Sequence, residues 1–227
     1  MTIDVYLEVA GKRVFAGAEA WPGWSRSGRD EAAALDALAA YGARYRRALG
    51  RAAAGLHPPS GPGDLRVTER LPGSASTEFG VPGAITKADG RRMTTDEEKA
   101  WSAMLRASWR AFDRAAHAAQ GVELAKGPRG GGRDLERIVG HVLDAEKAYL
   151  HKLGGVYRAE EGIEDEADLA AVRRAGTVVL AALARGEPAP RTPRSGSLWP
   201  PRYFVRRSAW HALDHAWEIE DRVDDAG

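Results

Sequence analysis

The sequence predicts an α+β protein, in which a small N-terminal unit of the ββαβ type precedes an all-α four-helix bundle. Near the N-terminus, apolar and polar residues alternate, which is the pattern of a strand with one buried face. After about residue 93, apolar residues recur at helical spacing in four successive segments. This change of period divides the chain into two expected domains, 1–92 and 93–227, both of ordinary domain size.

The N-terminal unit is expected to begin with a strand over the alternating residues Ile3, Val5, Leu7 and Val9. Gly11 and Lys12 then form a turn. Expected after it, in chain order, are a second strand over 13–20, a break at 21–24, a helix over 30–49, a loop over 57–63, and strands over 65–71 and around Ile85.

The first helix of the bundle has a strong start signal, because Thr94 and Thr95 form two overlapping capping boxes with Glu97 and Glu98. The glycine-rich segment 127–132 is expected to close that region. The remaining helices are expected from Asp134 to the glycines at 154–155, over 165–183, and from the Pro200-Pro201 pair to Val223. The Pro/Gly/Ser-rich segment 186–201 reads as a long loop.

The composition excludes several kinds of partner and of chemistry. Lys and Arg number 33 against 32 Asp and Glu, so no net field favours nucleic acid or an anionic membrane as a partner. The chain has no cysteine, which excludes disulfides, thiolate metal ligands and a cysteine nucleophile. No signal-peptide pattern and no membrane-length apolar run is present, so the cytoplasm is the expected location.

Three histidines form the candidate metal site. His211 and His215 lie four residues apart on the predicted fourth helix, so both imidazoles project from one side, one turn apart. They flank the apolar stripe of that helix, and His141 flanks the stripe of the second helix. Three such ligands leave a fourth position open, as in reactive metal sites. The alternative is that all three are buried histidines satisfied by neighbouring polar groups.

Two segments carry a family resemblance. GHVLDAEKAYL (140–150) and RRSAWHALDHAWEI (206–219) resemble the DinB/YfiT-like superfamily over about residues 93–225. The resemblance implies a four-helix bundle, commonly a homodimer, in which three histidines hold zinc, nickel or iron. It also implies activities such as thiol-dependent transfer on small molecules. FAGAEAWPGWSRSGRDEA (15–32) is similar to HicB-like antitoxin domains, a hint about fold alone.

Other residues are candidates for chemistry around the ion. Glu146 falls on the apolar stripe of the second helix, where a carboxylate needs a partner, a metal or a route to water; it and Tyr149 are candidate proton carriers. Candidate substrate-binding residues are Arg202, Arg206 and Arg207.

Three acidic residues near the histidines have two readings. Asp144, Asp214 and Glu218 either orient the imidazoles or are solvated charges paired with Arg206 or Arg207. Likewise, the outward stripe formed by Trp210, Leu213 and Trp217 is expected to be covered either by the N-terminal unit or by a second subunit.

The function predicted from these features is a metal-dependent enzyme, either a thiol-dependent S-transferase or a hydrolase, acting on a small molecule. Zinc is the first choice of metal, with nickel and iron as alternatives. Because the chain has no thiol of its own, a low-molecular-weight thiol is the expected co-substrate. The alternative function is a non-catalytic metal-binding or regulatory module whose N-terminal unit engages a protein partner.

Overall fold

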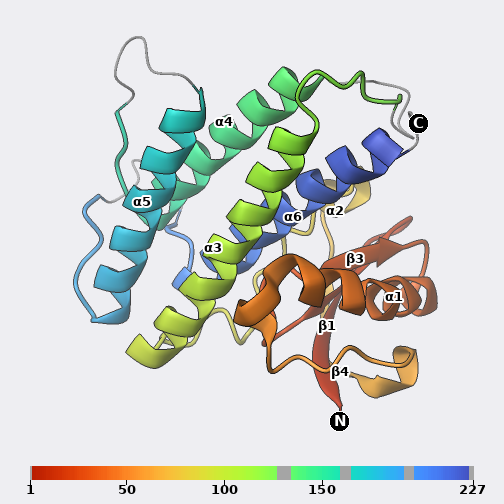
Figure 1. Ribbon diagram of the computed structural model, residues 1–227. Coiled ribbons are helices and arrows are strands. Elements are labelled where there is room, and N and C mark those ends of the chain that lie inside the picture. The colour runs from red at the N-terminus through yellow and green to blue at the C-terminus, as the bar shows by residue number, and fades with distance from the viewer. Residues whose placement is uncertain (1, 127–133, 159–164, 192–196, 225–227) are drawn as a thin grey trace.

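The computed structural model describes residues 2–126, 134–158, 165–191 and 197–224. A four-stranded mixed sheet and its helix come first, and four long helices follow (Figure 1). The strands are β1 (Ile3–Val9), β2 (Val14–Ala18), β3 (Ser25–Gly28) and β4 (Leu65–Pro72). The α-helices are α1 (Glu31–Leu49), α2 (Ala75–Phe79), α3 (Thr95–Ala118), α4 (Leu135–Leu153), α5 (Asp165–Ala184) and α6 (Pro201–Asp224). Two short 3-10 turns, η1 (Gly50–Ala53) and η2 (Pro62–Asp64), lie between α1 and β4.

The sheet has the strand order β3-β2-β1-β4. The β1–β2 and β2–β3 pairs are antiparallel, whereas β4 pairs with β1 in parallel. A parallel pair requires a long crossover, which α1 supplies. The result is an α+β unit with three strands before its helix and one after it.

Both faces of β1 are buried, so the expectation of one buried face is wrong. Val5 and Leu7 are fully buried, but Tyr6 and Glu8 on the opposite face are also only 1% exposed. The buried Glu8 carboxylate accepts hydrogen bonds from Thr77 Oγ1 and from the backbone N–H groups of Gly83 and Ala84. Polar residues in an alternating pattern are read as exposed, but they can be buried when each has a hydrogen-bond partner. The sequence pattern alone does not show whether such partners exist.

The break expected at 21–24 is confirmed, since these residues form a turn with Gly23 at φ 90°. The strand β3 that follows this turn directly was not expected from the sequence. Trp24 fixes that turn, because its buried indole donates a hydrogen bond to Leu38 O of α1 and stacks on Tyr45. No strand forms around Ile85, so the strand expected there is wrong; Ile85 is 45% exposed and lies in an irregular segment.

The helix bounds of the C-terminal part match the sequence prediction closely. Thr94 caps α3, and Glu97 completes the capping box by accepting from Thr94 N. Asp134 caps α4, and Gly154 ends it in the left-handed conformation. The predicted boundary at 127–132 lies outside the described residues, as do 192–196 of the predicted loop.

The four long helices pack in a ring, in which α3 contacts α5 and α6, and α4 contacts α5 and α6 (Figure 1). The apolar stripe of α6 faces this ring, and Val205, Ala209, Ala212, Ala216 and Ile219 are completely buried. Residues of the N-terminal unit and of the helices belong to one hydrophobic core.

The N-terminal unit, and not a second subunit, covers the outward stripe of α6. Trp210, Leu213 and Trp217 are at most 4% exposed. Trp210 meets Phe15 of β2 edge to face, and Trp217 meets Tyr41 of α1 in the same way. The α6 helix therefore lies between the helical ring on one side and the α+β unit on the other.

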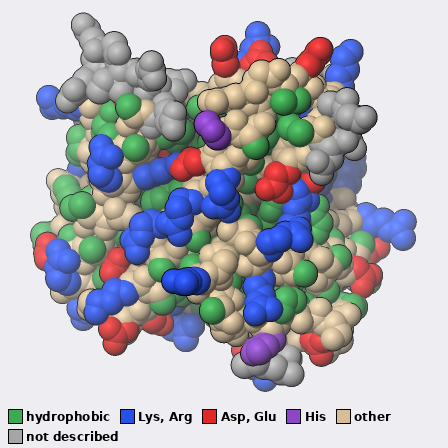
Figure 2. All heavy atoms as spheres, in the orientation of Figure 1, with side chains coloured by type: hydrophobic (Ala, Val, Ile, Leu, Met, Phe, Trp, Pro, Cys, Tyr) green, Lys and Arg blue, Asp and Glu red, His purple; other side chains and the backbone are tan. Residues whose placement is uncertain are grey.

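Among the described helices, none has the length and apolar character needed to cross a membrane. The exposed side of α3 carries Arg106, Arg110 and Arg114. Figure 2 shows Lys and Arg side chains gathered across the face of the molecule where α3 lies. A near-neutral net charge therefore coexists with a locally basic surface.

Candidate metal centre

Three histidines from two helices meet at one point. His141 comes from α4, and His211 and His215 come from successive turns of α6. Each offers one ligand atom, and these atoms all lie within 4.8 Å of one another. The Nε2 atoms of His141 and His211 are 3.3 Å apart. The sequence prediction that these three side chains converge is therefore supported by the structure.

Neighbouring rings surround the imidazoles of the triad and limit their exposure to solvent. His211 is 6% exposed, and its ring contacts those of His141, His215 and Tyr149 at centroid distances of 5.1, 4.6 and 5.6 Å. His141 is partly buried, and the His215 side chain retains 12% exposure. The cluster therefore lies at the edge of the core, with His141 and His215 partly exposed.

Glu218 orients His215. Its Oε2 lies 2.8 Å from His215 Nδ1, and since a carboxylate can only accept, Nδ1–H is the donor. The other ring nitrogen, Nε2, is then the one with a lone pair for a ligand. A carboxylate behind an imidazole is the usual arrangement at protein metal sites.

The donor set fits a divalent transition metal. For zinc–nitrogen bonds of about 2.0–2.1 Å, tetrahedral geometry separates two ligand nitrogens by roughly 3.3 Å. The His141–His211 separation has this value. Two neutral imidazoles that share a hydrogen bond can also lie at this distance. The two interpretations differ in the metal content they predict.

Glu146 belongs to a different cluster from the histidines. Its two carboxylate oxygens accept from Nε and Nη2 of Arg173 on α5, at 2.9 and 3.1 Å. Arg173 Nη1 also pairs with Asp113 of α3 at 2.7 Å. Burial raises the pKa of Glu146, and the Arg173 charge opposes that rise. Both oxygens are therefore engaged in an ion pair that joins α3, α4 and α5.

Arg173 was not among the site residues predicted from the sequence, although the sequence contains a signal for it. A carboxylate on the apolar stripe of one helix requires a buried cation nearby. Arg173 lies directly beside the apolar residues Val172 and Gly176 of the predicted third helix, and so was the candidate partner.

The three arginines of α6 have different environments. Arg202 donates to Glu97 and thereby lowers the pKa of that carboxyl to about 2. Arg206 is buried, with a bidentate pair to Asp89. Both charges are neutralised inside the protein. The geometry thus sets Arg202 and Arg206 in structural contacts, and only Arg207 lies beside the triad.

Arg207 and Tyr149 flank the histidines. The Arg207 guanidinium carbon lies 5.4 Å from the centroid of Tyr149 and 4.8 Å from that of Trp210. Burial raises the pKa of the Tyr149 hydroxyl, so this phenol is protonated at neutral pH and can donate a proton. These two residues and the triad are the predicted site residues that the fold brings together.

The three acidic candidates also have distinct environments. Glu218 contacts His215 and, at 3.4 Å, Arg222. Asp214 pairs with Arg26 of β3 at 3.3 Å, and Asp144 is exposed on α4. None of the ion pairs found among the described residues joins these acids to Arg206 or Arg207, so the predicted pairing with those arginines is wrong.

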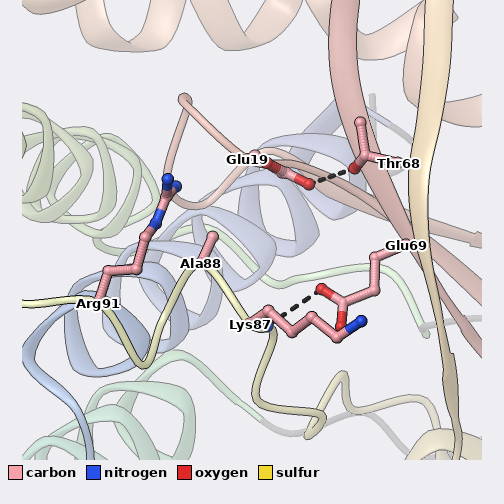
Figure 3. A pocket seen from close by; sticks show the side chains of 6 residues that line it. All are labelled: Glu19, Thr68, Glu69, Lys87, Ala88 and Arg91. Atoms are coloured by element: carbon pink, nitrogen blue, oxygen red, sulfur yellow. Dashed lines mark hydrogen bonds between the residues drawn. The ribbon is translucent and has the colours of Figure 1, made fainter.

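Two surface cavities lie away from the triad. One, of about 270 Å³, is lined by residues of the sheet edge and of the segment before α3: Glu19, Thr68, Glu69, Lys87, Ala88 and Arg91 (Figure 3). Figure 3 shows Glu19 pointing to Thr68 and Glu69 pointing to the Lys87 backbone, so these polar groups satisfy one another. The other, of about 440 Å³, lies between α1, α3 and the end of α6. Neither includes a histidine.

Comparisons with protein-family models, with curated proteins and with solved structures found no match to this chain.

Proposed function

We propose that this protein is a divalent-metal-dependent enzyme, with a helical ring that forms a bundle of the DinB-like type. The convergence of His141, His211 and His215 carries the proposal. Three protein ligands leave a coordination position for a substrate, as is typical of reactive zinc sites. Zinc is the preferred ion, with nickel and iron as alternatives, because imidazole suits all three.

Each residue around the site has a role in this proposal. A divalent ion there supplies a Lewis acid that lowers the pKa of a coordinated thiol or water. Glu218 holds the tautomer and direction of His215 through the Nδ1 hydrogen bond. Tyr149, protonated and in contact with the His211 ring, donates a proton to a leaving group. Glu146 is assigned to the Arg173 ion pair and not to proton transfer.

The proposed reaction class is transfer of a low-molecular-weight thiol to an electrophilic small molecule. Since the chain contains no cysteine, the nucleophilic sulfur must come from a co-substrate. Hydrolysis, with water in place of the thiol, uses the same arrangement. The family resemblance of 140–150 and 206–219 favours the thiol.

Metal analysis tests the core of the proposal. Protein purified without a histidine tag and dialysed against zinc should contain about one equivalent of metal by mass spectrometry. At a free zinc concentration of 100 times Kd, binding should stabilise the fold by about 2.7 kcal/mol. The His211→Ala and His215→Ala variants should lose both effects, while the exposed His117 provides the control in His117→Ala.

A thermal-shift screen of small thiols then tests the reaction class. Stabilisation of the zinc-loaded protein by a thiol, lost in His215→Ala, supports transfer chemistry. Zinc bound without any response to thiols favours the regulatory module. Absence of stoichiometric metal, with wild-type stability in His211→Ala, contradicts the metal site itself.

A further inference from the structure

The charges at the start of α6 are neutralised unequally. Arg202 pairs with Glu97, and Arg206 pairs with Asp89. For Arg207, in contrast, no Asp or Glu of the described ranges lies within ion-pair distance, and its guanidinium donates a hydrogen bond to Pro82 O at 3.5 Å. It is therefore a partly buried cation without a carboxylate partner among the residues that the structure describes.

Aromatic rings hold this cation beside the triad. The guanidinium of Arg207 lies near the rings of Tyr149 and Trp210. Both rings contact His211, at centroid distances of 5.6 and 6.2 Å. The guanidinium of Arg207 and the imidazole of His211 thus share the same two aromatic neighbours. Aromatic contacts attract a cation without cancelling its charge, so Arg207 can still attract an anion.

The position of Arg207 is also fixed from the N-terminal unit. Pro82 lies in the segment between α2 and α3, and its neighbour Gly83 accepts a hydrogen bond from Tyr203. Gly83 and Ala84 in turn bind the buried Glu8. This segment of the N-terminal unit therefore packs beside Arg207 and gives it a contact that the helical ring alone does not provide. A guanidinium held in this way loses little entropy when a ligand binds.

We propose that Arg207 is the anion-binding residue of the site, and that the substrate carries a carboxylate in addition to the group that meets the metal. The planar guanidinium matches a carboxylate through two parallel N–H···O bonds. The inference rests on the proposed metal-dependent function for the second contact, whereas recognition of the carboxylate depends on Arg207 itself.

Two thiols that differ in one group test this proposal on the full-length protein. Mercaptoacetate carries a carboxylate, and 2-mercaptoethanol carries a hydroxyl in its place. Calorimetry on the zinc-loaded protein should show mercaptoacetate binding about tenfold more tightly or better, the value of a charge-assisted pair. The Arg207 Nε–H resonance should shift with mercaptoacetate and not with 2-mercaptoethanol.

Variants identify the residue responsible. Arg207→Met should abolish the preference while leaving zinc stoichiometry and the affinity for 2-mercaptoethanol unchanged. Arg207→Lys should keep a weaker preference for mercaptoacetate, because lysine keeps the positive charge but cannot form two parallel hydrogen bonds to a carboxylate. Arg110→Met, on the exposed side of α3, is the matched control and should behave as wild type.

The failures can be told apart. Equal affinities of the wild type for the two thiols, or a preference that survives Arg207→Met, would overturn the role of Arg207 while the metal site stands. A protein that binds no zinc would overturn the metal function. The same resonance titration on the metal-free protein then decides the anion site, and an Arg207 signal unmoved by mercaptoacetate overturns it.

Discussion

At the scale of single residues, Glu146 shows that a carboxylate at a position typical of a reactive group can have a structural role. A carboxylate on an apolar stripe suggests a reactive group, because burial is costly without a purpose. In the structure, Arg173 meets both of its oxygens, and Asp113 shares the guanidinium. The purpose is to join three helices across the core. We therefore expect its loss to be felt in stability.

Replacing Glu146 by Ala should lower the free energy of unfolding by about 3–5 kcal/mol, because Arg173 would keep only the half-exposed Asp113. Urea denaturation measures this change. Asp144→Ala, which removes an exposed carboxylate from the same helix, should change it by less than about 0.5 kcal/mol. A Glu146→Ala protein of wild-type stability that has lost activity would restore the catalytic assignment.

The candidate site could be predicted from the sequence in part. His211 and His215 are neighbours by helical geometry alone, and the family resemblance adds His141. What could not be predicted is which of the nearby arginines has no carboxylate partner and can bind a ligand. Arg202, Arg206 and Arg207 are alike in sequence, yet Glu97 and Asp89 neutralise two of them from segments more than a hundred residues away. Such pairings depend on tertiary packing.

At the scale of elements, the helices were predictable because their signals are local. A capping threonine begins α3, a capping aspartate begins α4, and a left-handed glycine ends α4, each where the sequence indicates. The short strand β3 has no such signal, since Ser25–Gly28 contains no apolar residue. It forms because β2 offers it hydrogen bonds and α1 covers it, which local sequence does not encode.

The capping of α3 allows a sharp test, because the sequence offers two threonines and the structure uses one. Thr94→Ala should cost about 1 kcal/mol of stability, since it removes the acceptor for Glu97 N. Thr95→Ala is the matched control and should be nearly neutral, because Thr95 is the first residue inside the helix. Equal losses in the two variants, measured by urea denaturation, would mean that the helix begins elsewhere.

At the scale of the whole molecule, the two expected domains are not independent. Trp210, Leu213 and Trp217 on α6 are covered by the α+β unit, and buried residues of both parts form one core. The sequence left open whether this stripe meets the N-terminal unit or a second subunit. Only the packing of β2 and α1 against α6 decides between them.

A shared core predicts a single unfolding transition. Calorimetry of the full-length protein should give equal calorimetric and van't Hoff enthalpies. Trp217→Ala should lower stability by about 3–5 kcal/mol and keep one transition, because the lost contacts belong to both parts. Val178→Ala, at a 68% exposed position of α5, should leave the transition unchanged. Two resolved transitions in the wild type would contradict the shared core.

The burial of α6 on two opposite sides limits how this protein can change over evolutionary time. Most substitutions on that helix would disturb the sheet unit, the helical ring or the histidines. The segment from Val81 to Gly90 borders Arg207 and contains no helix or strand, but its Gly83, Ala84 and Asp89 bind Glu8 and Arg206, so it is constrained as well. A new specificity is therefore expected to arise from single side-chain changes around Arg207, and not from remodelling of α6 or of this segment.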